Sequence, residues 1–105
     1  MSSESNRLEM IKTMLAENPT DPFLLYAAAL EYKKREMTTE AGAIFEQIVR
    51  DHPDYLAVYY QYGKFMESID PERSAELYKK GIELAKKEGE QKTRQELEEA
   101  LFLLD

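Results

Sequence analysis

The sequence has 105 residues, no cysteine and a single histidine, His52. Without cysteine the chain can form neither a disulfide nor a thiolate zinc site, and it has no cysteine nucleophile. A histidine-based metal site would need ligands beside His52 that the sequence does not supply, so we expect no metal and no cofactor. His52 precedes Pro53 at an expected helix end, where a histidine usually stabilises the last carbonyls. The lack of cysteine fits a reducing compartment, and we expect a cytoplasmic protein.

Long apolar segments and catalytic motifs are missing too. The longest apolar run, Phe23 to Leu30, is far too short to span a bilayer, and no cationic segment leads into an apolar one at the start. We therefore expect neither a membrane span nor a signal peptide. There is no glycine-rich phosphate loop and no nucleophile elbow. Neighbouring acids such as Glu98 and Glu99 are expected to point to different sides of a helix, as solvated residues do. These features predict a protein that is not an enzyme.

Positive charge is in the minority. The chain has 14 basic and 21 acidic residues, which gives a net charge of −7. An acidic surface is repelled by the phosphate backbone, so nucleic-acid binding is disfavoured.

Apolar residues recur at helical spacing, and no segment alternates as a strand would. Six helices are expected, about residues 5–17, 22 to a break near 36, 38–51, 54–67, 71–88 and 91–104. Asp21 and Asp70 precede prolines and are expected to cap helices, Thr38 or Thr39 is the expected cap of the third helix, and Gly89 is the expected stop of the fifth. The side chains expected to face inward are Leu8, Ile11, Met14, Leu15, Leu25, Ala28, Ala29, Tyr32, Ala41, Ile44, Phe45, Ile48, Val49, Tyr59, Tyr62, Gly63, Met66, Leu77, Tyr78, Gly81, Ile82, Leu97, Ala100, Leu101 and Leu104.

An internal repeat of about 34 residues separates Pro19 from Pro53. Its small and large positions are Leu25, Ala28, Ala29, Tyr32, Ala41, Phe45, Ile48 and Pro53. This pattern, over residues 22–53, resembles the tetratricopeptide repeat (TPR) family. Residues 56–87 match less well, because the second helix fits only if one loop residue is dropped and the closing proline is missing.

The flanking segments complete the resemblance. Residues 5–17 resemble the second half of a preceding repeat, and residues 91–104 resemble the first half of a following one. The resemblance implies an all-α fold of antiparallel helix-turn-helix repeats, a TPR-like right-handed α-solenoid in a single domain of residues 1–105. Ala29 and Gly63 would let helix backbones approach, and Tyr32, Phe45 and Tyr78 would fill the space between pairs. An unrelated six-helix bundle is the competing interpretation.

The resemblance also implies a concave groove formed by the first helices of successive pairs. By position it places these residues there: Phe23, Tyr26, Ala27, Leu30, Lys33, Lys34, Tyr60, Gln61, Lys64 and Glu67. Independently of the family, Tyr26, Leu30, Lys33 and Lys34 share one helical face by their spacing. Tyrosines beside lysines suit a peptide or partner protein with apolar side chains and carboxylates. The alternative is that this stripe packs on the terminal helix of the chain or is solvated.

Two further functional expectations concern specificity and self-association. The lysine and asparagine clamp by which some TPR domains bind acidic chaperone tails is broken here, since Tyr26 and Leu30 stand in its first unit and Gln61 and Lys64 in its second. Phe102 and Leu103 lie off the inward face of the last helix, where they either form an exposed apolar patch or cover the neighbouring pair. The sequence thus predicts a noncatalytic protein-interaction module, and the alternative is a self-association unit, such as a weak homodimer through the terminal helices.

Overall fold

The computed structural model describes residues 3–104, with side chains from residue 6 onward, and this part of the chain contains six helices and no strand. The expected all-α fold is therefore confirmed. The chain divides into two compact units that meet at His52 and Pro53 in the sequence. Each unit contains three of the helices.

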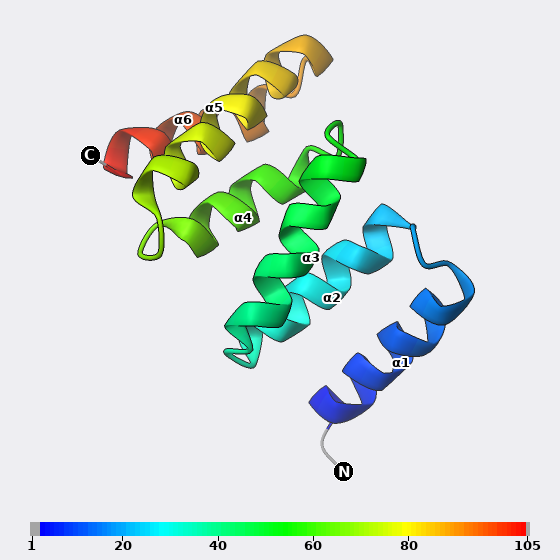
Figure 1. Cartoon of the computed structure of the whole chain (residues 1–105). Coiled ribbons are helices and arrows are strands. Elements are labelled where there is room, and N and C mark those ends of the chain that lie inside the picture. Colours follow the sequence, from blue (N-terminus) through cyan, green and yellow to red (C-terminus); the bar gives the residue numbers. More distant parts are fainter. Residues whose placement is uncertain (1–2, 105) are drawn as a thin grey trace. The chain divides into compact units, whose positions relative to one another are not determined.

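The first unit consists of α1 (Ser3–Glu17), α2 (Pro22–Lys34) and α3 (Thr38–Asp51). Helices α2 and α3 pack together as an antiparallel pair, and α1 packs against α2 (Figure 1). The buried apolar side chains of this unit are Leu8, Ile11, Leu24, Leu25, Ala28, Ala29, Ala41, Phe45, Ile48 and Val49. They recur at three- and four-residue intervals because only one side of each helix faces its neighbours.

The boundaries of α2 show the expected cap at its start and a left-handed turn at the expected break near residue 36. The carboxylate of Asp21 accepts hydrogen bonds from the backbone N–H of Phe23 at 2.9 Å and of Leu24 at 3.3 Å, as predicted. At the other end Glu36 adopts a left-handed φ of 60°, and Met37 N–H donates to the Tyr32 carbonyl at 2.9 Å. This backbone turn stops α2 with a glutamate where glycine is usual.

The expected threonine cap of α3 is wrong. Met37 occupies the N-cap position, and no side chain caps the helix there. Both Thr38 and Thr39 lie inside the first turn, because the left-handed turn at Glu36 leads directly into α3.

The second unit consists of α4 (Ala57–Met66), α5 (Pro71–Glu88) and α6 (Gln91–Leu104). Helix α5 packs against both α4 and α6, and α4 also contacts α6. Asp70 caps α5 through the backbone N–H of Arg73 at 3.2 Å, and Gly89 ends it with a φ of 72°, both as predicted. The buried side chains are Val58, Tyr59, Tyr62, Ser74, Leu77, Tyr78, Ile82, Ala85, Leu97 and Ala100.

Helix α4 is shorter than predicted. It begins at Ala57 rather than near residue 54, because Pro53 and Asp54 form a turn and the Val58 N–H then donates to the Tyr55 carbonyl three residues earlier. The hydroxyl of Tyr59 donates to the Pro53 carbonyl and holds this turn against the helix.

Two glycines of the second unit make room for side chains. A Cβ added to Gly63 would lie 2.4 Å from Cε1 of Tyr78, whose ring is fully buried. A Cβ added to Gly81 would lie 2.7 Å from Cβ of Tyr59 and 2.9 Å from Cδ1 of Leu97. The Oγ of Ser74 on α5 also donates to the Gly63 carbonyl at 2.7 Å, so α5 lies close to the α4 backbone at this glycine. Tyr78 occupies the space beside Gly63 inside the α4–α5 pair.

Some residues expected to face inward are less buried than predicted. Met14 is 48% exposed, because α1 packs through Leu8 and Ile11 and Met14 lies beside that face. The side chains that are only half-buried are Leu15, Tyr32, Ile44, Met66, Leu101 and Leu104.

Candidate peptide-binding surfaces

Helix α2 carries five of the predicted binding residues, which we call the α2 face: Phe23, Tyr26, Leu30, Lys33 and Lys34. Phe23 is 65% exposed, Lys34 is exposed, and the other three side chains are half-buried. Intervals of three and four residues place them along one side of the helix. Both lysines lie in the last turn of α2, where their positive charge interacts favourably with the negative end of the helix dipole.

Helix α4 carries the other predicted residues, the α4 face: Tyr60, Gln61, Lys64 and Glu67, the last of which is the C-cap residue. The ammonium of Lys64 lies 5.6 Å from the centre of the Tyr60 ring, a cation–π distance. It is also 3.7 Å from a carboxylate oxygen of Glu67. Lys64 thus contacts both an aromatic ring and a carboxylate within the second unit.

Glu67 has a structural role that the sequence did not reveal. The same oxygen that faces Lys64 accepts a hydrogen bond from the Tyr78 hydroxyl at 2.6 Å. Burial raises the pKa of Tyr78, and the hydrogen bond to Glu67 and its negative charge raise it further. The centres of the Tyr78 and Tyr60 rings are 6.4 Å apart. The buried, neutral phenol of Tyr78 therefore packs against the α4 face.

A buried glutamate with arginine partners in the first unit was also missed. Glu31 is 5% exposed, and one carboxylate oxygen lies 3.2 Å from Nη1 of Arg7 on α1. The other oxygen lies 3.5 Å from Nε of Arg35, one turn further along the chain. The four-residue spacing of Glu31 and Arg35 is the signal that could have indicated the pair, whereas the Arg7 contact depends on how α1 packs.

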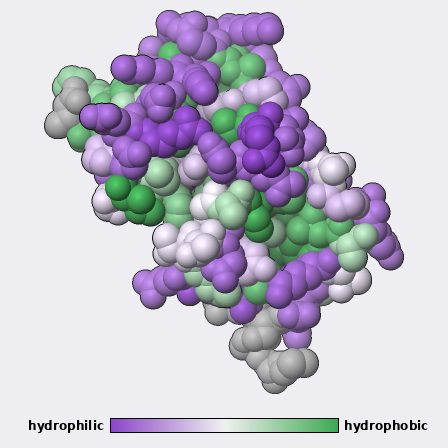
Figure 2. All heavy atoms as spheres, in the orientation of Figure 1, coloured by the Kyte–Doolittle hydropathy of each residue, from purple (hydrophilic) through white to green (hydrophobic). Residues whose placement is uncertain are grey.

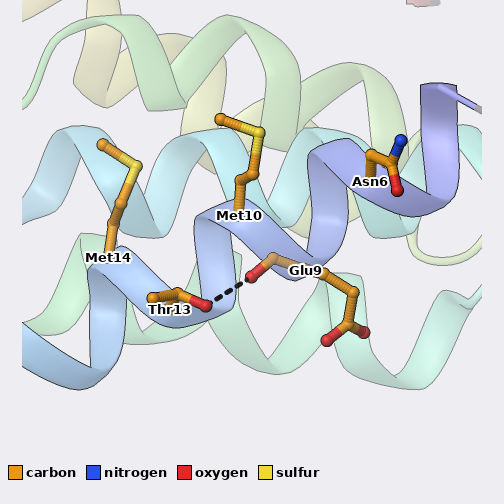
Figure 3. A pocket seen from close by; sticks show the side chains of 5 residues that line it. All are labelled: Asn6, Glu9, Met10, Thr13 and Met14. Atoms are coloured by element: carbon orange, nitrogen blue, oxygen red, sulfur yellow. Dashed lines mark hydrogen bonds between the residues drawn. The ribbon is translucent and has the colours of Figure 1, made fainter.

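Two apolar surfaces lie outside the predicted faces. Met10 and Met14, 64% and 48% exposed, project from one side of α1 together with Asn6, Glu9 and Thr13 (Figure 3). Phe102 and Leu103, 80% and 76% exposed, line a shallow hollow on α6 with Glu98 and Glu99. Both glutamates are exposed, as expected of solvated residues. Elsewhere, hydrophilic side chains cover most of the surface visible in Figure 2.

The described residues hold neither a metal-binding cluster nor a membrane-spanning helix. That part of the chain holds no group of three or more histidine, aspartate or glutamate side chains arranged to bind a metal ion. Among its helices, none combines the length and apolar character that crossing a bilayer requires.

Comparison with known proteins rests on solved structures. No family model matches the sequence, and no curated protein matches it. The solution structure of a tetratricopeptide repeat domain protein from Salinibacter ruber is 40% identical, with a TM-score of 0.78 over 83% of this chain and 89% of that one. A crystal structure of a tetratricopeptide repeat domain protein from the same organism is also 40% identical, with a TM-score of 0.76 over 80% of this chain and 96% of that one.

A more distant structure shows the same fold. A protein from Bordetella parapertussis is 21% identical, with a TM-score of 0.77 over 92% of this chain and 85% of that one. The repeat pattern around Ala29 and Phe45, the six helices and the 40% identity to the Salinibacter domain agree. The chain belongs to the tetratricopeptide repeat family.

Proposed function

We propose that this protein is a noncatalytic interaction module that binds a peptide or partner protein through the α2 and α4 faces. The tetratricopeptide fold generally serves protein–protein interaction. The observation that carries the proposal is the α2 face, where an exposed phenylalanine is followed along one side by a tyrosine, a leucine and two lysines.

The chemistry of this face favours a ligand with apolar and acidic side chains. Phe23 offers exposed aromatic area at low entropic cost, since its side chain has few rotatable bonds. Lys33 and Lys34 attract carboxylates in a chain whose net charge is −7, so they favour an acidic ligand at this end of α2.

The α4 face is expected to contribute to binding mainly through its aromatic ring. Lys64 is already in contact with Tyr60 and Glu67, so a ligand carboxylate must compete with Glu67 for the ammonium. We expect Tyr60 to supply most of the contact energy on this helix, because its aromatic ring can bury area without breaking an ion pair.

A direct test uses a synthetic peptide of Asp, Glu, Leu and Phe, titrated into the labelled full chain and followed by NMR. The changes should centre on the α2 and α4 faces. The double substitution Lys33→Glu and Lys34→Glu should weaken binding about tenfold. Lys79→Glu with Lys80→Glu is the matched control, because it changes the net charge equally at exposed positions on α5.

The outcomes are distinct. Equal weakening by both double substitutions would mean that only net charge matters, and the proposal would be wrong. A peptide whose contacts all fall on α3 and α5 would also contradict it. Capture of a cellular partner that is lost on Tyr26→Ala with Tyr60→Ala would identify the physiological ligand.

The alternative function is self-association through the terminal helices. The observation in its favour is the exposure of apolar side chains on both, Met10 and Met14 on α1 and Phe102 and Leu103 on α6. Sedimentation at several concentrations tests it, and a strict monomer excludes it.

A further inference from the structure

The exposed side chains of Phe102 and Leu103 on α6 lie between two glutamates and the negative end of the helix dipole. We call the residues Glu98, Glu99, Phe102 and Leu103 the α6 surface. Each glutamate lies four residues, about one helical turn, before one of the apolar side chains. The last turn of α6 contains no basic residue, so the negative end of its dipole is not compensated by its own side chains. Negative charge therefore flanks the apolar pair on both sides along the helix.

The carboxylates of Glu98 and Glu99 are exposed and can interact with a cation of a ligand. Glu98 lies 4.0 Å from Arg94, the outer limit of an ion pair, and 45% of its side chain is exposed. Glu99 is also exposed. An exposed ion pair at this distance contributes little, so it opposes an incoming cation only weakly.

A second copy of the chain that pairs the α6 surface with its own counterpart is a poor occupant. Such two-fold pairing would bring two surfaces of the same negative charge against each other. The two apolar side chains together expose on the order of 300 Å², well below the roughly 800 Å² per partner of a standard stable interface. Charge and area both favour a small ligand element of opposite charge.

We propose that the α6 surface docks a basic amphipathic helix of a partner protein. Leucine or phenylalanine side chains of that helix would cover Phe102 and Leu103, and lysine or arginine one turn away would meet Glu98 and Glu99. The lysine or arginine side chains of the ligand would be partly buried beside the apolar contact. Their attraction to Glu98 and Glu99 is screened less there than on an open surface. The proposal does not depend on the α2 and α4 faces. It concerns a different helix, α6, and a basic ligand instead of an acidic one.

The test uses a synthetic peptide of Leu and Lys with a two-heptad amphipathic pattern, about 14 residues. It is titrated into the labelled full chain and followed by NMR, with a peptide in which Glu replaces each Lys as the control. We expect changes centred on the α6 surface, weaker binding at higher salt, and no comparable binding of the acidic peptide.

Two double substitutions locate the site. Phe102→Ser with Leu103→Ser should weaken binding about tenfold, while helicity stays unchanged because both side chains are exposed. Glu98→Gln with Glu99→Gln, which keeps the apolar pair, should weaken binding and reduce its salt dependence. Met10→Ser with Met14→Ser removes the exposed pair beside Glu9 on α1 and should have no effect.

Several results would overturn the proposal. One is that the methionine substitutions weaken binding as much as those on α6, since the peptide would then favour any exposed apolar pair. Another is that shift changes scatter over all acidic surfaces. A third is that the α6 surface mediates self-association, shown by a dimer that Phe102→Ser with Leu103→Ser abolishes while the basic peptide fails to bind.

Discussion

Replacing Gly63 by alanine should destabilise the protein, although the same change in an open helix is favourable. Alanine gains about 1 kcal/mol over glycine in a helix interior. Here the added Cβ would lie 2.4 Å from Cε1 and 2.7 Å from Cδ1 of Tyr78. That ring is fully buried, and its hydroxyl is held by Glu67 at 2.6 Å, so it has little freedom to retreat.

The expected magnitude follows from the two opposing effects. Overpacking a core costs about 1 to 3 kcal/mol, and a clash with a fixed ring belongs to the upper part of that range. After the gain in helix propensity, the free energy of unfolding should fall by about 1 to 2 kcal/mol. The measurement is urea unfolding monitored by circular dichroism. The dependence of the unfolding free energy on urea concentration should be the same for both proteins.

The control is the same substitution in a Tyr78→Met background. Methionine removes the ring and adapts its shape, so Gly63→Ala should there become neutral or stabilising by up to about 1 kcal/mol. The reasoning is refuted if alanine at Gly63 stabilises the native chain, or if its effect is the same in both backgrounds.

Three further predictions concern local strain, pH and the ion pair between Arg7 and Glu31. Glu36→Gly should raise the free energy of unfolding by about 0.5 to 1 kcal/mol because its φ is 60°, and Glu36→Ala should not, which thermal unfolding can compare. Because the folded-state pKa of Tyr78 is raised above 10.0, its proton stabilises the folded state fully below pH 10.0, and stability is lost as pH rises above that value. Alkaline unfolding should therefore be less steep for Tyr78→Phe, and an equally steep profile would contradict this assignment. Glu31→Gln should speed hydrogen exchange of the α1 amides, because the Arg7 contact that joins α1 to α2 loses its charge, and unchanged exchange would show that apolar packing alone holds α1.

Local chemistry determined much of this fold directly from the sequence. Asp21 and Asp70 next to prolines, and Gly89 after a long apolar stripe, define helix ends by interactions that span only a few residues. The repeated spacing of alanine, tyrosine and phenylalanine identified the family, because such spacing reports which helix side is buried. The same spacing placed the α2 face on one side of a single helix.

Only the tertiary structure decided what lies across from each side chain. It showed that Gly63 accommodates the Tyr78 ring, that Glu67 holds the phenol of that ring, and that Arg7 reaches Glu31 from another helix. It also left Met14 exposed beside a face that packs through its neighbours. Periodicity gives the direction of a side chain around its own helix, whereas contacts between helices depend on their rotation and spacing, which no local pattern encodes.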